Sequence, residues 1–221
     1  MSPLIAVPAL IAALAATEPQ TVSRATSVAP NVHMNTLYGP TGLINVPTAN
    51  TAERGVVGFG AGFAKDFRGP TANWGVVDSI EVGGAFLDRT GADSKAIANA
   101  KVKIVPSNFN WFDVGVGVID VADAINQTFY VVGSAAIVPP NFSPDNAFAA
   151  RIHAGVGTGL FSEKLFAGGE IFLNNKTALV GEWDSKNFNA AFRFRHMEMF
   201  AIQAGVANKG LFLSSTVSLK F

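Results

Sequence analysis

The chain has 221 residues, of which 49% are hydrophobic and only 14% are charged. Sixteen Lys and Arg residues balance sixteen Asp and Glu residues, so no net basic field attracts nucleic acid. The absence of cysteine excludes disulfides and thiolate metal sites, and we expect no cofactor. The combination of 22 glycines and 18 phenylalanines with so few charges is more typical of β-barrels than of helical proteins.

The N-terminus begins with an apolar segment that is too short to span a membrane as a helix. Residues 4–16 consist of Leu, Ile, Ala, Val and Pro, and they end in small residues just before the polar Thr17. This pattern predicts a secretory signal peptide over residues 1–16, although no Lys or Arg precedes it; a buried helix is the alternative. Residues 17–40 are rich in Thr, Ser, Asn, Ala and Pro and are predicted to form a weakly structured periplasmic leader.

From residue 41 onward, hydrophobicity alternates with a period of two in segments of about ten residues separated by turn residues. The predicted strands are 41–48, 55–65, 79–88, 95–105, 111–121, 128–138, 147–158, 165–174, 177–185, 188–196, 199–207 and 210–221. We therefore predict an all-β fold, a single closed antiparallel transmembrane β-barrel of about 12 strands over residues 41–221.

Each predicted strand has one apolar face and one face of charges and glycines. In residues 188–195, every second residue is Phe or Ala, whereas the other face carries Arg193 and Arg195. A soluble barrel shows the same alternation with its apolar face inward, so periodicity alone does not choose between the two. The predicted signal peptide, the low charge and the small residues of the polar face favour an apolar surface that faces membrane lipid.

The polar faces of neighbouring strands mostly carry charges of opposite sign. Inside a narrow lumen, cross-strand pairs offset much of the desolvation of buried charges. We therefore predict a lumen charge network, with a solvated sheet surface as the alternative. Its members are Glu81, Lys101, Lys103, Asp113, Arg151, His153, Glu170, Glu182, Asp184, Arg193 and Arg195. Within it, Glu182 and Asp184 are expected to reach the two arginines of the following strand.

Glycines and aromatic residues add two expectations. The alternating glycines of residues 58–62 predict a lumen-facing stripe that leaves room for side chains opposite. Trp74, Trp111 and Trp183 lie near predicted strand ends, where they form either an interfacial aromatic girdle or ordinary core. The last predicted strand ends on Phe221 and resembles the signal that the barrel-assembly machinery reads, so we expect that machinery as a partner.

Two segments carry motifs that are less generic than barrel strands. Residues 39–49 (Gly-Pro-Thr-Gly-Leu-Ile-Asn-Val-Pro-Thr-Ala) contain Gly-Leu, three residues and Pro-Thr-Ala. The key positions of this first motif are Gly42, Leu43, Pro47, Thr48 and Ala49. The second combines a Glu-Trp-Asp strand at 179–184 with an Asn-containing strand at 188–195 that has a basic end.

Together these motifs resemble the YjbH-type family of outer-membrane proteins linked to exopolysaccharide production. The resemblance implies an outer-membrane barrel tied to cell-surface polysaccharide. This chain is far shorter than the long family members, which resemble more than one barrel-like unit in series.

We expect a non-enzymatic barrel in the outer membrane of a diderm bacterium. The three histidines are scattered without metal-ligand spacing, and His153 lies on the predicted lumen face, away from where a membrane lipase would act. The leading function is an accessory role in polysaccharide export or envelope organisation, with outer-membrane lipid and polysaccharide as further partners. Two alternatives remain: a general diffusion porin for ions and small polar solutes, and a soluble exported β-barrel that binds a hydrophobic ligand.

Overall fold

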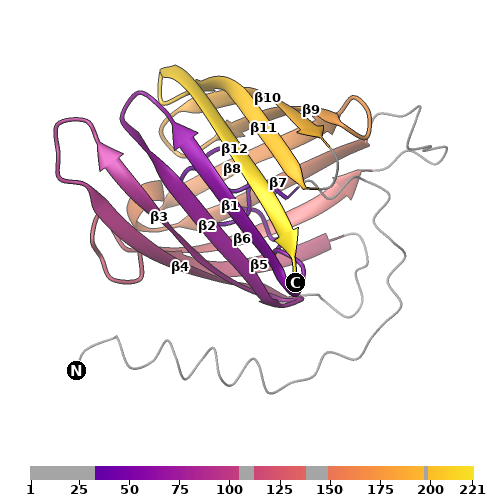
Figure 1. The fold of residues 1–221 in the computed structure, drawn as a ribbon, viewed down its shortest axis with the longest axis horizontal. Coiled ribbons are helices and arrows are strands. Elements are labelled where there is room, and N and C mark those ends of the chain that lie inside the picture. Colours follow the sequence, from indigo (N-terminus) through magenta and orange to yellow (C-terminus); the bar gives the residue numbers. More distant parts are fainter. Residues whose placement is uncertain (1–32, 105–111, 138–148, 197–198) are drawn as a thin grey trace.

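The computed structural model describes residues 33–104, 112–137, 149–196 and 199–221, in which twelve antiparallel strands close into one barrel (Figure 1). The strands are β1 (Val56–Phe63), β2 (Phe67–Val77), β3 (Ile80–Arg89), β4 (Lys95–Ile104), β5 (Phe112–Ile119), β6 (Thr128–Ile137), β7 (Ala149–Gly157), β8 (Lys164–Phe172), β9 (Thr177–Trp183), β10 (Phe188–His196), β11 (Phe200–Ala207) and β12 (Gly210–Lys220). A short 3-10 helix, η2 (Gly159–Phe161), follows β7. The predicted closed barrel is confirmed, whereas the predicted signal peptide over 1–16 lies outside the described residues.

Neighbouring strands in the sequence are neighbours in the barrel, and β12 closes it against β1. The closing seam runs without interruption from the pair Val56–Lys220 to the pair Phe63–Leu213. Beyond it, the backbone N–H of Phe221 donates to the carbonyl oxygen of Gly55 at 3.0 Å. Because every strand is paired on both sides, the wall leaves no open sheet edge.

The predicted strand at 41–48 is wrong. This segment lies inside the barrel, and Pro47 has no N–H to donate to a ladder. It instead forms a small hairpin, with Leu43 N–H bonded to Val46 O and a bridge between Gly42 and Pro47. The structure also places the end of the predicted leader, residues 33–40, in the lumen with defined hydrogen bonds rather than as a weakly structured tail.

β2 was not predicted, because its sequence looks like a loop. It contains Gly69 and Pro70, and its inward positions include the polar Thr71 and Asn73. Pro70 has no N–H, and the pairing of β2 with β3 is interrupted there, between Arg68 and Thr71. The two errors cancel, which is why the predicted number of strands is nevertheless twelve.

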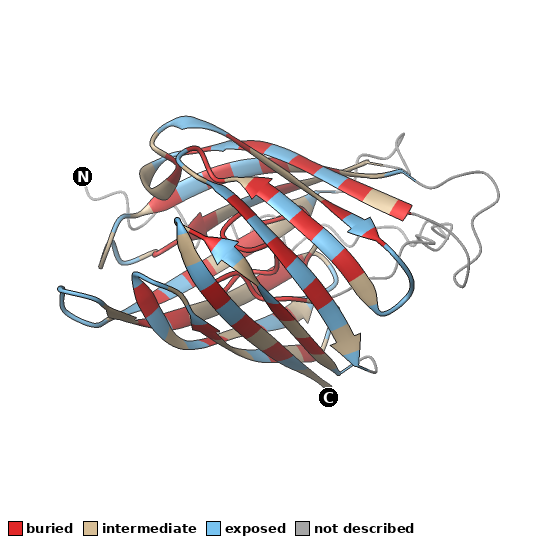
Figure 2. Ribbon diagram, turned by 90° about the horizontal axis from the view of Figure 1, so that it is seen from above, coloured by how far each residue is buried: buried red, intermediate tan, exposed pale blue. Residues whose placement is uncertain are grey.

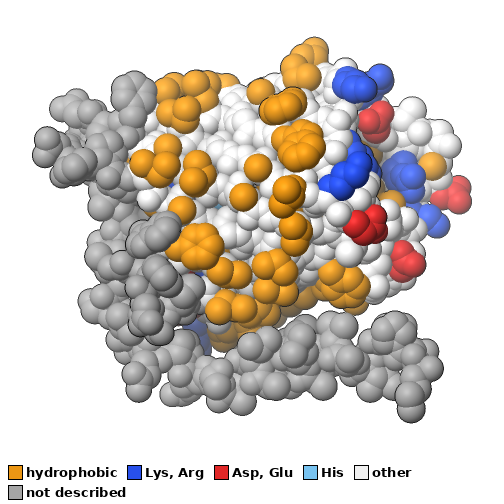
Figure 3. Space-filling model, turned by 180° about the vertical axis from the view of Figure 1, so that it is seen from behind, with side chains coloured by type: hydrophobic (Ala, Val, Ile, Leu, Met, Phe, Trp, Pro, Cys, Tyr) orange, Lys and Arg blue, Asp and Glu red, His pale blue; other side chains and the backbone are white. Residues whose placement is uncertain are grey.

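The barrel is apolar outside and polar inside. Buried and exposed residues alternate along each strand (Figure 2), and hydrophobic side chains cover the middle of the outer surface while the visible charges gather toward one end (Figure 3). Outward side chains include Phe59, Phe86, Phe129, Ile152, Ile171, Leu179, Phe192, Leu213 and Val217, each more than a third exposed. Of the tryptophans, Trp74 is 46% exposed and Trp183 shares its outward parity with Leu179, whereas Trp111 lies outside the described residues.

Residues 33–52 fill the lumen, and we call this segment the plug. It starts near the end of the barrel where β1 begins, with His33 beside Asn73. It reaches the opposite end where the ring of Tyr38 packs on Phe67, their centroids 5.4 Å apart. It then returns, so that the hydroxyl of Thr51 donates to the carbonyl oxygen in the turn between β2 and β3. From residue 34 to residue 49, all residues but Tyr38 are buried.

Candidate functional site

The Glu182 carboxylate of β9 binds three consecutive backbone N–H groups of the plug. Its Oε2 accepts from Ile44 at 2.9 Å and Val46 at 3.1 Å, and its Oε1 accepts from Asn45 at 2.8 Å. The side-chain amide of Asn189 on β10 also donates to Oε1, at 2.9 Å. Buried backbone donors require partners, and one wall side chain therefore satisfies a whole turn of the plug.

Arg193 of β10 binds the carbonyl side of the same turn. Its Nη2 donates to the backbone oxygens of Leu43 at 3.1 Å and Gly42 at 3.3 Å. Gln203 of β11 donates to the Leu43 oxygen at 3.1 Å, and its own oxygen accepts from the arginine at 2.9 Å. An ion pair with Glu170 of β8 balances the buried guanidinium. Glu182 thus binds the N–H groups of this plug turn, whereas Arg193 and Gln203 bind its carbonyl oxygens.

A second anchor is built from Glu81 and Lys101, which face each other across β3 and β4. Their charged atoms lie 3.3 Å apart. Glu81 accepts from the backbone N–H groups of Thr41 at 2.9 Å and Ala52 at 2.7 Å, while Lys101 donates to the Thr41 carbonyl oxygen at 2.9 Å. The amide of Asn73 donates to the Thr41 hydroxyl at 2.9 Å. This anchor ties both arms of the plug to one patch of wall.

Neutral polar side chains fix the plug at two further points. The Asn35 backbone N–H donates to the hydroxyl of Thr216 on β12 at 3.1 Å. The Ala49 N–H donates to the hydroxyl of Ser134 on β6 at 2.9 Å, and that hydroxyl contacts Nδ1 of His153 on β7 at 2.8 Å. Contacts therefore surround the plug on all sides of the barrel.

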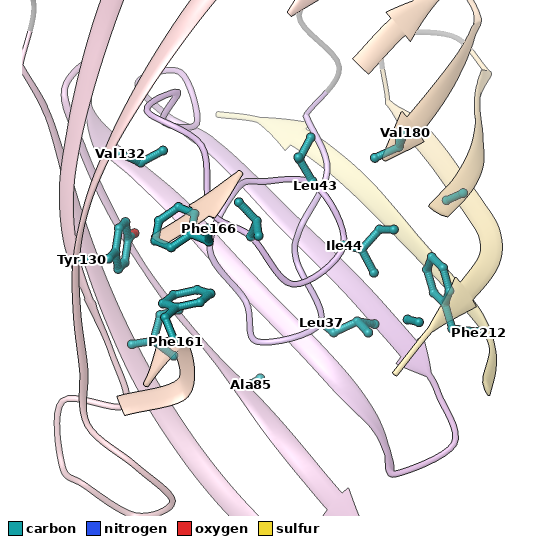
Figure 4. Packing of buried hydrophobic residues seen from close by; sticks show 14 of the residues in the cluster. Leu37, Leu43, Ile44, Ala85, Tyr130, Val132, Phe161, Phe166, Val180 and Phe212 are labelled. Atoms are coloured by element: carbon teal, nitrogen blue, oxygen red, sulfur yellow. The ribbon is translucent and has the colours of Figure 1, made fainter. Parts of the chain in front are cut away.

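Wall glycines provide the space that the plug fills. A side chain at Gly62 would collide with Leu37 of the plug, and one at Gly168 would collide with Leu43. One at Gly58 would collide first with Asn73 of the wall and would also crowd His33 of the plug. In the predicted glycine stripe at 58–62, Gly62 thus leaves room for the plug, Gly60 leaves room for wall groups, and Gly58 leaves room for both. In Figure 4, the plug side chains Leu37, Leu43 and Ile44 lie among wall residues of the hydrophobic cluster, which include Tyr130, Val132, Phe161, Phe166, Val180 and Phe212.

The structure places all eleven residues of the predicted charge network on the inward parity of their strands or just beyond. Eight are nearly inaccessible to water: Glu81, Lys101, Arg151, His153, Glu170, Glu182, Asp184 and Arg193. Three are partly exposed near the end of the barrel where β1 begins: Lys103, Asp113 and Arg195. Arg151 faces Glu170 across β7 and β8, and its guanidinium lies 5.5 Å from the centre of the Phe172 ring.

The predicted ion pairs between β9 and β10 are wrong. They joined Glu182 and Asp184 to Arg193 and Arg195. The antiparallel register instead sets Glu182 opposite Asn189 and Arg193 opposite Ala178, several rungs apart. Asp184, which follows β9, accepts from the side-chain amide of Asn45 at 2.9 Å. The acids of this segment hold the plug rather than the neighbouring strand.

The uncharged polar residues of the site were not predicted, because only charged residues and one histidine were considered as members of the lumen network. The uncharged wall residues that bind the plug include Asn73, Ser134, Gln203 and Thr216. All lie on the inward face of their strands, so the alternation of the sequence identifies them once the lumen is known to be filled.

Burial shifts the pKa of two plug side chains. Desolvation lowers the pKa of His33 below its usual value, although Glu81 and the hydrogen bond to Asn73 oppose this. Burial raises the pKa of the Tyr38 hydroxyl well above its usual value, and the nearby Asp184 adds to that. Both groups are therefore neutral in the plugged barrel at neutral pH.

The described residues contain no cluster of three His, Asp or Glu side chains arranged to hold a metal ion. In the same part of the chain, no helix has the length and apolar character needed to cross a membrane. The sequence matches no protein-family model, and comparison with curated proteins finds no significant similarity.

Proposed function

We propose that this protein is an outer-membrane β-barrel that is closed at rest by its own plug and serves cell-surface polysaccharide export as an accessory, non-conducting component. One observation carries the closed state. The plug and the wall groups that bind it are buried, with Leu43 at 0%, Lys101 at 1% and Arg193 at 1% exposure. A barrel whose central wall residues are out of reach of water offers no continuous path for ions.

The membrane assignment is supported by the outer surface. Large apolar side chains such as Phe59, Phe86 and Leu213 are half-exposed around the wall, and soluble proteins rarely expose so extensive an apolar surface. An outward apolar band with a polar interior is the pattern of membrane barrels. A soluble barrel that binds a hydrophobic ligand needs the opposite arrangement, so this alternative is disfavoured.

The polysaccharide role is supported by where the family-like motifs lie. Leu43, Pro47, Thr48 and Ala49 of the first motif are plug residues, and Glu182 belongs to the second. The two motifs meet in one contact, since the Glu182 carboxylate binds the plug turn that starts after Leu43. The two segments that resemble one family therefore bind each other directly.

The non-enzymatic assignment rests on access. Ser134 Oγ lies 2.8 Å from Nδ1 of His153, whereas a Ser-His-Asp hydrolase sets its serine against Nε2 of the histidine. Both side chains are buried, and the Ser134 hydroxyl already accepts a hydrogen bond from Ala49 of the plug. A substrate carbonyl has no approach to this hydroxyl.

The closed state is tested by single-channel recording in planar lipid bilayers. We expect the wild-type barrel to insert without stable current steps. The double variant Glu182→Ala/Arg193→Ala should show such steps, because the plug turn loses the wall side chains that bind its N–H and carbonyl groups. The chain has no cysteine, so Ala49→Cys/Ser134→Cys can be added as a redox-sensitive staple between plug and wall. Oxidation should then silence the currents and reduction restore them. Steady conductance of the wild type would instead favour the porin alternative.

The polysaccharide role is tested in cells of the source bacterium. Secreted polysaccharide should fall when the gene is deleted, and wild-type protein supplied from a plasmid should restore it. Glu182→Ala/Arg193→Ala, at equal protein level in the membrane, should not. Unchanged secretion in the deletion strain would refute the accessory role while leaving the plugged barrel intact.

A further inference from the structure

A small hollow lies on the rim of the barrel, where β1 begins and β12 ends. It spans three adjacent strands and is lined by Glu53, Arg54, Trp74, Asp78, Lys220 and Phe221, among others. Trp74 points outward from β2 and is 46% exposed, and Phe221 is 86% exposed. The hollow therefore joins the apolar outer surface of the wall to a set of charges at its edge.

The backbone around this hollow is fixed. Gly55 N–H donates to the Gly75 carbonyl oxygen at 2.8 Å, and the Phe221 N–H donates to the Gly55 carbonyl oxygen at 3.0 Å. The Arg54 backbone N–H donates to Oδ1 of Asp78 at 3.3 Å. The segment that leaves the plug is thus clamped between the ends of β2 and β12, and its side chains start from defined positions.

The charged side chains of the hollow are two acids and two bases, of which one acid and one base form an ion pair. Lys220 and Glu53 form an exposed ion pair at 3.2 Å. Within the described residues, the Arg54 guanidinium has no hydrogen-bond or ion-pair partner, and the Asp78 carboxylate has no cationic partner. A guanidinium and a carboxylate, neither of them in an ion pair, lie beside an exposed indole at the edge of the apolar surface.

We propose that this hollow binds the headgroup of a zwitterionic phospholipid with a primary ammonium, such as phosphatidylethanolamine. Arg54 binds the phosphate, for which a guanidinium offers matching paired donors. Asp78 accepts hydrogen bonds from the ammonium, and Trp74 packs against the glycerol region as an interfacial anchor. The proposal rests on the proposed membrane location of the barrel.

The charge pattern favours this headgroup over the other common ones. A purely anionic headgroup would leave Asp78 facing negative charge without a cation. The quaternary ammonium of phosphatidylcholine has no N–H to donate, so it lacks the hydrogen bonds that the carboxylate accepts. Free phosphate would gain nothing from the aromatic side of the hollow.

The test compares lipids by native mass spectrometry of the full-length barrel in detergent, titrated with phosphatidylethanolamine, phosphatidylcholine or phosphatidylglycerol of identical chains. We expect the first lipid to bind about tenfold more tightly than the other two, the effect of one charge-assisted contact. Arg54→Gln and Asp78→Asn should each abolish this preference. The control Lys176→Gln removes an exposed charge from the turn between β8 and β9, at the same end of the barrel, and should preserve it.

Three results would overturn the proposal: equal binding of the three lipids, an unchanged preference in both variants, or competition by millimolar inorganic phosphate as effective as that by the lipid. The last result would identify a simple phosphate site. Flotation of the wild type with liposomes, measured first, separates this question from the membrane assignment. A barrel that does not float refutes both proposals, whereas one that floats without lipid preference refutes only the headgroup site.

Discussion

Glu182 accepts hydrogen bonds from three plug N–H groups at a position that is 3% exposed. It stabilises the fold by accepting hydrogen bonds from N–H groups that burial has removed from water. Leaving a buried donor without a partner costs about 1–3 kcal/mol, more than the net gain from an ordinary hydrogen bond. The residue therefore acts as a structural cap for the plug turn.

Replacing Glu182 with Gln is predicted to lower the free energy of unfolding by about 1–3 kcal/mol, because one acceptor oxygen becomes a donor that faces N–H groups. Urea unfolding in detergent micelles, followed by tryptophan fluorescence, measures this. Glu163→Gln, in the exposed turn between β7 and β8, is the matched control and should change stability by less than about 0.5 kcal/mol. Equal effects of the two variants would contradict the capping role.

Arg193 and Arg68 provide a matched comparison of a buried and an exposed ion pair. Both pair with a carboxylate, but the Arg193–Glu170 side chains are 1% and 6% exposed and those of Arg68–Asp88 are 69% and 44% exposed. Arg193→Met should cost about 3–5 kcal/mol, because the buried Glu170 loses its ion pair and the Gly42 and Leu43 oxygens lose their donor, whereas Arg68→Met should cost at most about 1 kcal/mol. Adding Glu170→Gln to Arg193→Met should recover part of the loss. No recovery in the double variant would show that the unpaired charge is not the cause.

The plug is the element that gives the barrel its pH dependence at the His33 end. Burial lowers the pKa of His33, so the folded state binds its proton less readily than the unfolded state does. The stabilising effect of the neutral ring is complete above the unfolded pKa of about 6.5 and is lost progressively as the pH falls from there toward the folded pKa. His33→Asn should therefore show a flatter loss of stability than wild type between about pH 7.5 and pH 5. Parallel curves for the two proteins would refute the assignment.

The fit between plug and wall is tested by two glycines on adjacent strands. An added Cβ at Gly168 of β8 would collide with the Leu43 side chain, whereas one at Gly181 of β9 would meet nothing within 4 Å. Gly168→Ala should destabilise the barrel by about 1–3 kcal/mol through overpacking, and Gly181→Ala should be close to neutral. The temperature at which the band of the folded barrel disappears from a gel gives the comparison between the two variants. A neutral Gly168→Ala would mean that the plug is not packed against β8.

Most wall strands could be predicted from the sequence, because a strand with one lipid-like and one polar face has a clear period of two. The exceptions have physical causes. β2 has polar and proline positions that weaken the alternation, since its inward side chains serve the plug. The segment at 41–48 resembles a strand because Leu43, Ile44 and Val46 lie among small and polar residues. Its apolar residues, however, pack on the inner wall.

The inward position of the charged residues could be predicted from the sequence, but their binding of the plug could not. Parity places Glu81, Lys101 and Arg193 in the lumen, yet parity holds no information on what fills that lumen. The partners of these residues are backbone groups of the plug, at sequence separations above 100 residues for Arg193, and backbone groups leave no mark in the sequence. Within the glycine stripe at 58–62, Gly62 was a local sign of the plug, because a side chain there would collide with Leu37.

If the plug occupies the lumen of the membrane-inserted barrel, a thiol placed in the plug should be protected from water-soluble reagents. The chain contains no cysteine, so Val46→Cys in the plug and Ala92→Cys in the exposed β3–β4 turn each report one position. In liposomes permeabilised to a water-soluble maleimide, Val46→Cys should react at least about 100-fold more slowly than Ala92→Cys, which corresponds to an opening free energy of about 2.7 kcal/mol. Similar rates at the two positions in a folded barrel would show that the lumen is open to water and would contradict the account.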